Sequence, residues 1–221
     1  MSIKTFKKDY NPENALGPYL AELDIPPSLN APLEERCQYY HRIMDFDRNR
    51  GREYYSKNLQ KDLAKACVEK GIQGLKKEEL EKLENLITFA SFNPEGAMFT
   101  LLALNPKRVL LFYTKESEEK ALPQILDFLN SWERPPEVDQ VLYENRDTYE
   151  DDQIVSQRVR EFVKKHGPDR TAWDITPGPK DFNLVLTWAL PPEVTPLYLC
   201  HHWKDRRFQP GKEKIRKIFK I

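Results

Sequence analysis

The chain has 221 residues, and its 35 basic and 35 acidic residues give a formal net charge of zero. Hydrophobic residues make up 39% and charged residues 32% of the sequence, which excludes a fibrous or disordered protein and is typical of a globular one. The longest apolar runs, such as 109–113 and 184–190, are too short to cross a bilayer, and the N-terminus has no apolar signal core. We therefore expect a cytoplasmic protein that has no membrane partner.

The N-terminal part of the sequence predicts helices. Five prolines between residues 12 and 32 indicate loop with short turns, and helical spacing of apolar residues follows in 34–44 and 54–68. After two glycines, Leu80, Leu83 and Ile87 form one stripe that predicts a further amphipathic helix. Residues 1–93 are thus predicted to be a mainly helical interaction region.

The composition changes near Pro94 and Pro106, so a second domain is predicted over residues 94–221. Its apolar runs predict strands that alternate with amphipathic helices. The expected strands are 109–113, 138–145, 171–176 and 195–203. The expected helices are one through Ile125, Leu126 and Leu129, and two over 151–167 and 180–190. This alternation predicts an α/β fold, in which flanking helices cover a Rossmann-like, mostly parallel sheet.

The cysteines carry little functional signal. Cys37, Cys67 and Cys200 are widely spaced and are interpreted as reduced, buried thiols. Cys200, His201 and His202 could suggest zinc, but adjacent side chains on a strand point to opposite faces. We expect neither a metal nor a cofactor.

Two corners at predicted strand ends contain residues suited to binding a ligand. The first contains Thr114, Lys115 and Ser117, and the second begins at Asp174 and continues through Thr176, Gly178 and Lys180. Ligands of open parallel sheets bind beyond the carboxyl ends of strands, where a helix N-terminus and a lysine favour phosphate. Hydroxyl residues at such positions are also common helix caps, so Thr114 and Ser117 have a purely structural alternative.

The second corner, DITPGPK followed by FNLVLTWAL, resembles the strand–turn–helix signature of the CARF (CRISPR-associated Rossmann fold) family. The segment RVLLFYTKESEEKA is similar to the opening of those domains, and the resemblance covers about the last half of the chain. The sequence departs from the family at Pro177, where glycine is frequent, and at Pro179, which replaces a threonine.

The resemblance implies a sensor that binds cyclic tetra-adenylate or hexa-adenylate at a two-fold homodimer interface and regulates an effector protein in type III CRISPR antiviral signalling. Thr114 and Lys115 match the first-strand contacts, and Thr176, Gly178 and Lys180 match the phosphate-holding turn. Asp147 and Tyr149 follow the second predicted strand, where they would approach adenine or ribose.

Two alternatives stay open. Some members of the family cleave their ligand, so the chain could be a ring nuclease or another Rossmann-like enzyme that processes nucleotides, although no general base is identifiable. It could also be a nucleic-acid-binding adaptor, because 204–221 has eight basic and two acidic residues, a net charge of +6. In that segment Ile215, Ile218 and Phe219 have helical spacing, which predicts a helix with outward lysines.

Overall fold

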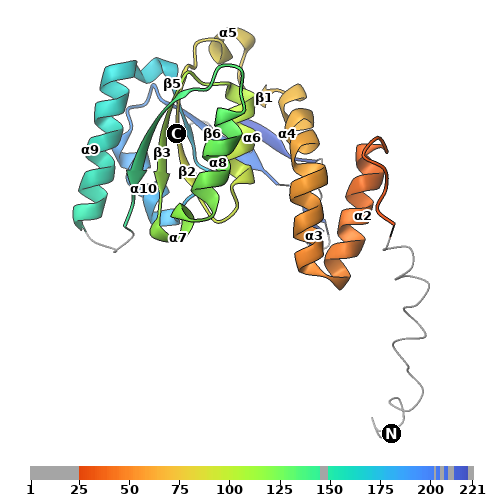
Figure 1. Ribbon diagram of the computed structural model, residues 1–221. Coiled ribbons are helices and arrows are strands. Elements are labelled where there is room, and N and C mark those ends of the chain that lie inside the picture. Colours follow the sequence, from red (N-terminus) through yellow and green to blue (C-terminus); the bar gives the residue numbers. More distant parts are fainter. Residues whose placement is uncertain (1–24, 145–148, 202, 205–206, 209–211, 219–221) are drawn as a thin grey trace, which may run out of the picture. The chain divides into compact units, whose positions relative to one another are not determined.

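The computed structural model describes residues 25–144, 149–201, 203–204, 207–208 and 212–218. The chain divides into two compact units, Met1–Leu63 and Ala64–Ile221. Each is described separately below, with element labels as in Figure 1. In the described part of the chain, no helix combines the length and the apolar character that crossing a membrane requires.

The described part of the first unit is helical. It contains α2 (Leu33–Phe46), α3 (Arg48–Tyr54) and the π-helical turn η2 (Tyr55–Leu59), and α4 (Gln60–Glu69) spans the boundary to the second unit. Tyr39 packs edge-on against Tyr54 in the interior, with ring centroids 4.7 Å apart. Asp47 separates α2 from α3, because its side chain accepts hydrogen bonds from the backbone N–H groups of Asn49 and Arg50 in the first turn of α3.

The second unit is built on a seven-stranded sheet with the order β1-β9-β6-β5-β2-β3-β4. The five strands from β6 to β4 are parallel; β9 is antiparallel to β6, and β1 is parallel to β9. The strands are β1 (Ile72–Gln73), β2 (Asn85–Ala90), β3 (Arg108–Tyr113), β4 (Glu137–Leu142), β5 (Thr171–Asp174), β6 (Thr195–Cys200) and β9 (Lys214–Lys217). A short hairpin, β7 (Trp203–Lys204) and β8 (Arg207–Phe208), forms a separate two-stranded sheet.

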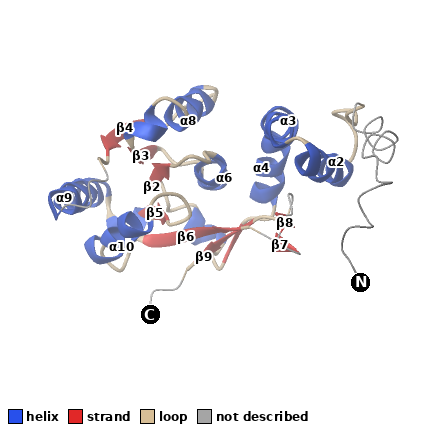
Figure 2. Cartoon of the chain, turned by 90° about the horizontal axis from the view of Figure 1, so that it is seen from below, coloured by secondary structure: helices blue, strands red, loops and turns tan. Residues whose placement is uncertain are grey.

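Helices cover both faces of the parallel region. Helices α6 (Glu95–Leu104) and α8 (Ala121–Asn130) lie on one side, and α9 (Tyr149–His166) and α10 (Lys180–Ala189) lie on the other (Figure 2). Short helical segments complete the connections: α5 (Lys77–Leu80), α7 (Lys115–Glu118) and the 3-10 turn η3 (Pro168–Arg170). The prediction of an α/β, Rossmann-like, mostly parallel sheet with flanking helices is confirmed.

The central strand β2 stabilises the sheet through its burial and its pairing with a strand on each side. All six of its residues are buried, and it pairs with β3 on one side and β5 on the other. A strand buried on both faces has a nearly continuous apolar sequence instead of an alternating one, as in Leu86–Ala90, where Thr88 is the one polar residue. Phe89 and Phe112 of the sheet pack edge-on against Phe182 of α10 at 4.8 and 4.9 Å, so α10 is held tightly over this core.

Two predictions about elements are wrong. The helix expected from Leu80, Leu83 and Ile87 is absent, because α5 ends at Leu80 and Ile87 lies in β2. β1 and β2 are strands of the seven-stranded sheet, and both precede residue 94. The predicted domain start at residue 94 therefore lies too late in the sequence. A five-residue apolar run satisfies helical spacing and strand spacing alike, and here the burial of both faces favours the strand.

The helix expected near the C-terminus is also replaced by a strand. Ile215 lies in β9, fully buried, between exposed Lys214 and Arg216, which is the two-residue alternation of a strand. Pairing with β6 satisfies the backbone groups that a helix would have satisfied internally. Ile218 follows the strand, and Phe219 lies outside the described residues.

Candidate ligand-binding corner at the switch point of the sheet

The strand order reverses between β2 and β5. From β2 the chain adds β3 and β4 towards one edge of the sheet, and then adds β5 and β6 on the opposite side of β2. In open parallel sheets, ligands bind beyond the carboxyl ends of the strands at such a switch point. Two corners meet there: residues 91–94, which lead from β2 into α6, and residues 175–179, which lead from β5 into α10.

The corner after β5 is held by side chains from its surroundings. Asp174 accepts a hydrogen bond from the backbone N–H of Thr176 (3.0 Å), and the Thr176 hydroxyl accepts one from the N–H of Leu199 in β6 (2.7 Å). Asn183 of α10 donates its side-chain amide to the carbonyls of Ile175 and Pro177, both at 3.3 Å. The turn is therefore fastened to β6 and α10 before any ligand binds.

Gly178 is required at its position in this turn. Its φ of +95° lies in a region that other residues rarely adopt. A Cβ atom would also lie 3.1 Å from Cγ of Phe89 and 3.3 Å from Cδ1 of Phe182, both buried. The absence of a side chain thus lets the turn pack directly on the aromatic core.

The first turn of α10 presents donors for an anion. Pro179 is its N-cap and no side chain caps the helix, so the N–H groups of Lys180, Asp181 and Phe182 have no intrahelical acceptor. Lys180 is exposed beside them. The Asp181 carboxylate is instead turned towards β4, where it accepts a hydrogen bond from the Tyr143 hydroxyl (2.7 Å). Burial, reinforced by Asp181, raises the pKa of Tyr143 well above its usual range, so this hydroxyl stays protonated.

The sequence does not predict the corner after β2, because the apolar residues of this strand continue the helical spacing of the residues before it. Pro94 is the N-cap of α6, which also has no side-chain cap. A Cβ atom added to Gly96 would lie 3.6 Å from the Thr176 methyl group, so the two corners are in close contact. Phe92 is 77% exposed here, and burial raises the pKa of Glu95. The signal that was available is Asn-Pro-Glu-Gly directly after an apolar run.

A buried polar cluster lies beneath the two corners. The second carboxylate oxygen of Asp174 accepts a hydrogen bond from the hydroxyl of Thr88 in β2 (3.4 Å). The hydroxyl of Thr100 in α6 donates to the Gly96 carbonyl (3.3 Å). Burial raises the pKa of Asp174 to about 6, although the hydrogen bonds from Thr176 and Thr88 oppose the rise. Asp174 is 1% exposed, so it organises the corner from below and does not face solvent.

The structure separates the predicted site residues into groups. Asp174, Thr176, Gly178 and Lys180 lie together at the switch point. Thr114, Lys115 and Ser117 follow β3, which neighbours β2 on the side away from β5. Tyr149 begins α9 after the edge strand β4 and is 76% exposed, and Asp147 lies outside the described residues.

Thr114 and Ser117 are engaged in capping α7. The Thr114 hydroxyl accepts the Ser117 N–H (3.3 Å), and the Ser117 hydroxyl accepts the Thr114 N–H (2.9 Å). Both side chains are buried. This reciprocal arrangement is a capping box, which accounts for both hydroxyls without a ligand.

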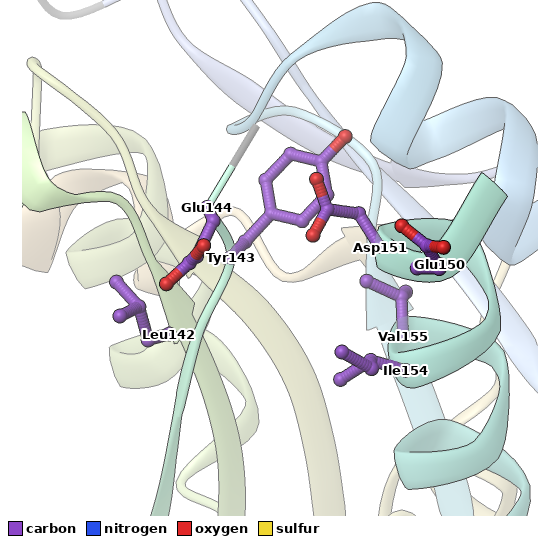
Figure 3. Close-up of a pocket in the computed structure, with 7 residues that line it drawn as sticks. All are labelled: Leu142, Tyr143, Glu144, Glu150, Asp151, Ile154 and Val155. Atoms are coloured by element: carbon purple, nitrogen blue, oxygen red, sulfur yellow. The ribbon is translucent and has the colours of Figure 1, made fainter. Parts of the chain in front are cut away.

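A pocket of about 340 Å³ lies between the end of β4 and the first turns of α9 (Figure 3). Among the described residues, its lining includes the carboxylates of Glu144, Glu150 and Asp151, together with Tyr143, and no basic side chain. Such a pocket disfavours phosphate. Within the described ranges, no group of three or more His, Cys, Asp or Glu side chains is arranged to hold a metal ion.

The sequence matches no model of a known protein family, and no curated protein is significantly similar to it. The resemblance to the CARF family therefore stays a prediction that rests on the segments DITPGPK and RVLLFYTKESEEKA.

Proposed function

We propose that the second unit binds a cyclic oligoadenylate at the carboxyl ends of β2 and β5. The observation that carries this proposal is the position of the DITPGPK corner. It lies at the switch point, where the uncapped N-terminus of α10 and the ammonium group of Lys180 are presented together. Backbone donors and a positive charge are the chemistry that a phosphodiester requires.

The neighbouring corner supplies what a nucleobase requires. Phe92 follows the central strand and exposes an aromatic face, and Asn93 beside it is an exposed amide. Stacking on an aromatic side chain is worth about 1–3 kcal/mol per base. Because the two corners are in contact through Gly96 and Thr176, one nucleotide can meet both.

A ring of identical nucleotides has internal symmetry, so it is bound efficiently by two copies of the same corner. In our proposal two protomers form a two-fold dimer and each contributes one corner after β5 and one after β2. Binding is then reported to an effector protein. Of the carboxylates at or beside the two corners, Asp174 is buried and hydrogen-bonded, Asp181 accepts the Tyr143 hydroxyl, and Glu95 has a pKa that is raised by burial. Sensing is thus better supported than cleavage.

Calorimetric titration tests the proposal, with cyclic tetra-adenylate and hexa-adenylate as probes and linear oligoadenylates of the same lengths as controls. Lys180→Ala is expected to weaken binding about tenfold to a hundredfold, since a hydrogen bond to a charged group is worth about 1.5–3 kcal/mol. Lys165→Ala is the matched control, because it removes an exposed lysine in the last turn of α9, near the start of β5 and so at the opposite end of the sheet from the corners. It is expected to change the affinity less than about twofold.

Three outcomes would contradict the proposal. The first is that neither ring binds, the second is that linear strands bind as tightly as rings, and the third is that the two lysine variants are equally impaired. Recovery of cleaved ring after many turnovers would identify a ring nuclease. Tight binding to mixed DNA or RNA that weakens steeply with salt would instead favour the adaptor alternative.

A further inference from the structure

Asp181 places a negative charge at the end of α10 where the proposed function places a phosphodiester. It is the second residue of the helix and is exposed. An acid in the first turn of a helix is ordinarily stabilising, because its carboxylate interacts favourably with the free backbone N–H groups there. A phosphate needs the same donors. The sequence of α10 therefore contains a competitor for its own ligand site.

In the structure the Asp181 carboxylate is bound elsewhere. One of its oxygens accepts the Tyr143 hydroxyl at 2.7 Å, which is the length of a strong hydrogen bond to a charged group. Pro179, the N-cap residue, has no side-chain acceptor to offer the helix. In the part of the chain that the structure describes, the N–H groups of Lys180, Asp181 and Phe182 are thus left without a side-chain acceptor.

The position of the Tyr143 hydroxyl is fixed independently of Asp181. The Tyr143 N–H bonds to the carbonyl of Tyr113 (2.7 Å), which continues the pairing of β4 with β3. The Tyr143 ring leaves the end of β4 on the side of α9 (Figure 3). It packs against Phe89 and Phe182, with ring centroids 6.2 and 5.6 Å away, and the residue is 3% exposed. Backbone pairing and ring packing therefore hold the donor in place.

We propose that Tyr143 is a positioning residue of the ligand site, which holds the Asp181 carboxylate away from the first turn of α10 and so keeps the N–H groups there available to a phosphate. The inference rests on the proposed function for the identity of the anion. Released from the hydroxyl, the carboxylate would turn onto the N–H groups of its own turn. A ligand would then have to displace it before binding.

The same hydrogen bond also ties β4 to α10, and a purely structural tie predicts a different pattern. If the tie alone mattered, removal of either partner would loosen the corner and would weaken binding equally. If Tyr143 positions the carboxylate, the two removals have opposite consequences. Loss of the hydroxyl frees the competitor, whereas loss of the carboxylate removes it.

Calorimetric titration of the full chain with cyclic tetra-adenylate and hexa-adenylate separates these roles. Tyr143→Phe keeps the ring and is expected to weaken binding about fivefold, which is the order of the capping interaction that the ligand must displace. Asp181→Ala is expected to bind at least as tightly as the wild type. The double variant is the matched control and is expected to recover the affinity of Asp181→Ala. Urea unfolding checks that every variant is folded.

A second measurement needs no ligand. In NMR spectra of the free protein, the amide protons of Asp181 and Phe182 are expected to move downfield in Tyr143→Phe, because the released carboxylate accepts hydrogen bonds from the first turn. The comparison of the double variant with Asp181→Ala is expected to show no such shift. It changes the same hydroxyl in a protein that has no carboxylate to release.

Three results would overturn the proposal. Asp181→Ala weakens ring binding as much as Tyr143→Phe does, the double variant stays as weak as Tyr143→Phe, or the amide protons of the first turn do not move in Tyr143→Phe. If no ring binds the wild type while the amide protons respond as expected, only the proposed function is contradicted. If a ring binds the wild type and Tyr143→Phe with equal affinity, only this inference is contradicted.

Discussion

Asp174 shows how a residue at a candidate site can act without facing the ligand. The sequence indicates an acid at a strand end beside a glycine turn, which suggests a contact residue. In the structure its carboxylate lies beneath the turn, where it accepts hydrogen bonds from the Thr176 N–H and the Thr88 hydroxyl. Its contribution to binding would then be to hold the corner in place, while Lys180 and the backbone of α10 face outward.

Asp174→Asn is expected to change the pH dependence of stability. Burial raises the folded-state pKa of Asp174 from 3.8 to about 6, so the folded protein holds this proton more tightly than the unfolded chain does. The stability due to that proton is fully present below about pH 4 and is lost as the pH rises through about 6. Asparagine cannot ionise, yet its carbonyl can still accept the Thr176 N–H.

Urea unfolding of both proteins at a series of pH values measures this effect. The wild-type free energy of unfolding, minus that of Asp174→Asn, should fall by on the order of 3 kcal/mol between about pH 4 and pH 7, since one pKa unit corresponds to about 1.36 kcal/mol. Subtracting the variant cancels the titration of the other groups. A difference that stays constant over this range would show that Asp174 is not perturbed by burial.

At the scale of elements, the sequence predicted most of the second unit because its patterns are long or strongly bounded. Strands β3, β4, β5 and β6 and helices α8, α9 and α10 all form where the alternation of apolar runs placed them. The run that forms β2 was predicted to belong to a helix. Leu80 and Leu83, with glutamate and lysine residues around them, have a helical spacing that Ile87 in β2 continues. Its burial depends on β3 and β5, which are distant in the sequence, so local periodicity could not reveal it.

For the same reason, the sequence predicted only one of the two corners of the candidate site. Pairing of β2 with β5 decides which corners meet, and that pairing is a property of the folded sheet. The sequence therefore identified the corner after β5 but assigned the opening corner to β3. Thr114 and Ser117 carry hydroxyls of the expected type, yet their geometry is that of a helix cap.

Thr114→Ala should therefore affect stability more than ligand binding. Loss of the cap is expected to cost about 1 kcal/mol of unfolding free energy, because the Ser117 N–H loses the Thr114 hydroxyl as an acceptor and keeps only the Thr114 carbonyl. Thr114→Ser retains the hydroxyl and should keep most of the wild-type stability. Urea unfolding combined with titration of cyclic tetra-adenylate measures both effects. An affinity loss of tenfold or more in a fully folded Thr114→Ala protein would restore Thr114 to the binding site.

At the scale of the whole molecule, the boundary between the two units is decided by the sheet. The sequence placed the second domain after a proline and glycine cluster at residues 94–106, where composition changes sharply. The structure instead begins the second unit at Ala64, so that β1 and β2 are included. Composition marks the corner between β2 and α6, which is a ligand-facing turn in our proposal, and does not mark a linker.

The boundary in the structure, at Ala64, and the boundary predicted from the sequence, at residue 94, predict opposite outcomes for fragments of the chain. Residues 60–221 keep α4 intact and retain every strand of the sheet, so this fragment is expected to unfold cooperatively. Residues 94–221 lack β2, whose removal would leave β3 and β5 with unpaired edges at the centre of the sheet.

That loss would also expose the apolar surfaces of α6 and α10 that pack on the central strand, so the shorter fragment is expected to aggregate or to show no cooperative transition. Thermal unfolding followed by circular dichroism, with sedimentation to detect aggregates, distinguishes the two cases. A cooperative transition in 94–221 would mean that β2 is dispensable and that the boundary predicted from the sequence, at residue 94, is correct. Failure of 60–221 to fold would mean that the second unit depends on residues before Gln60.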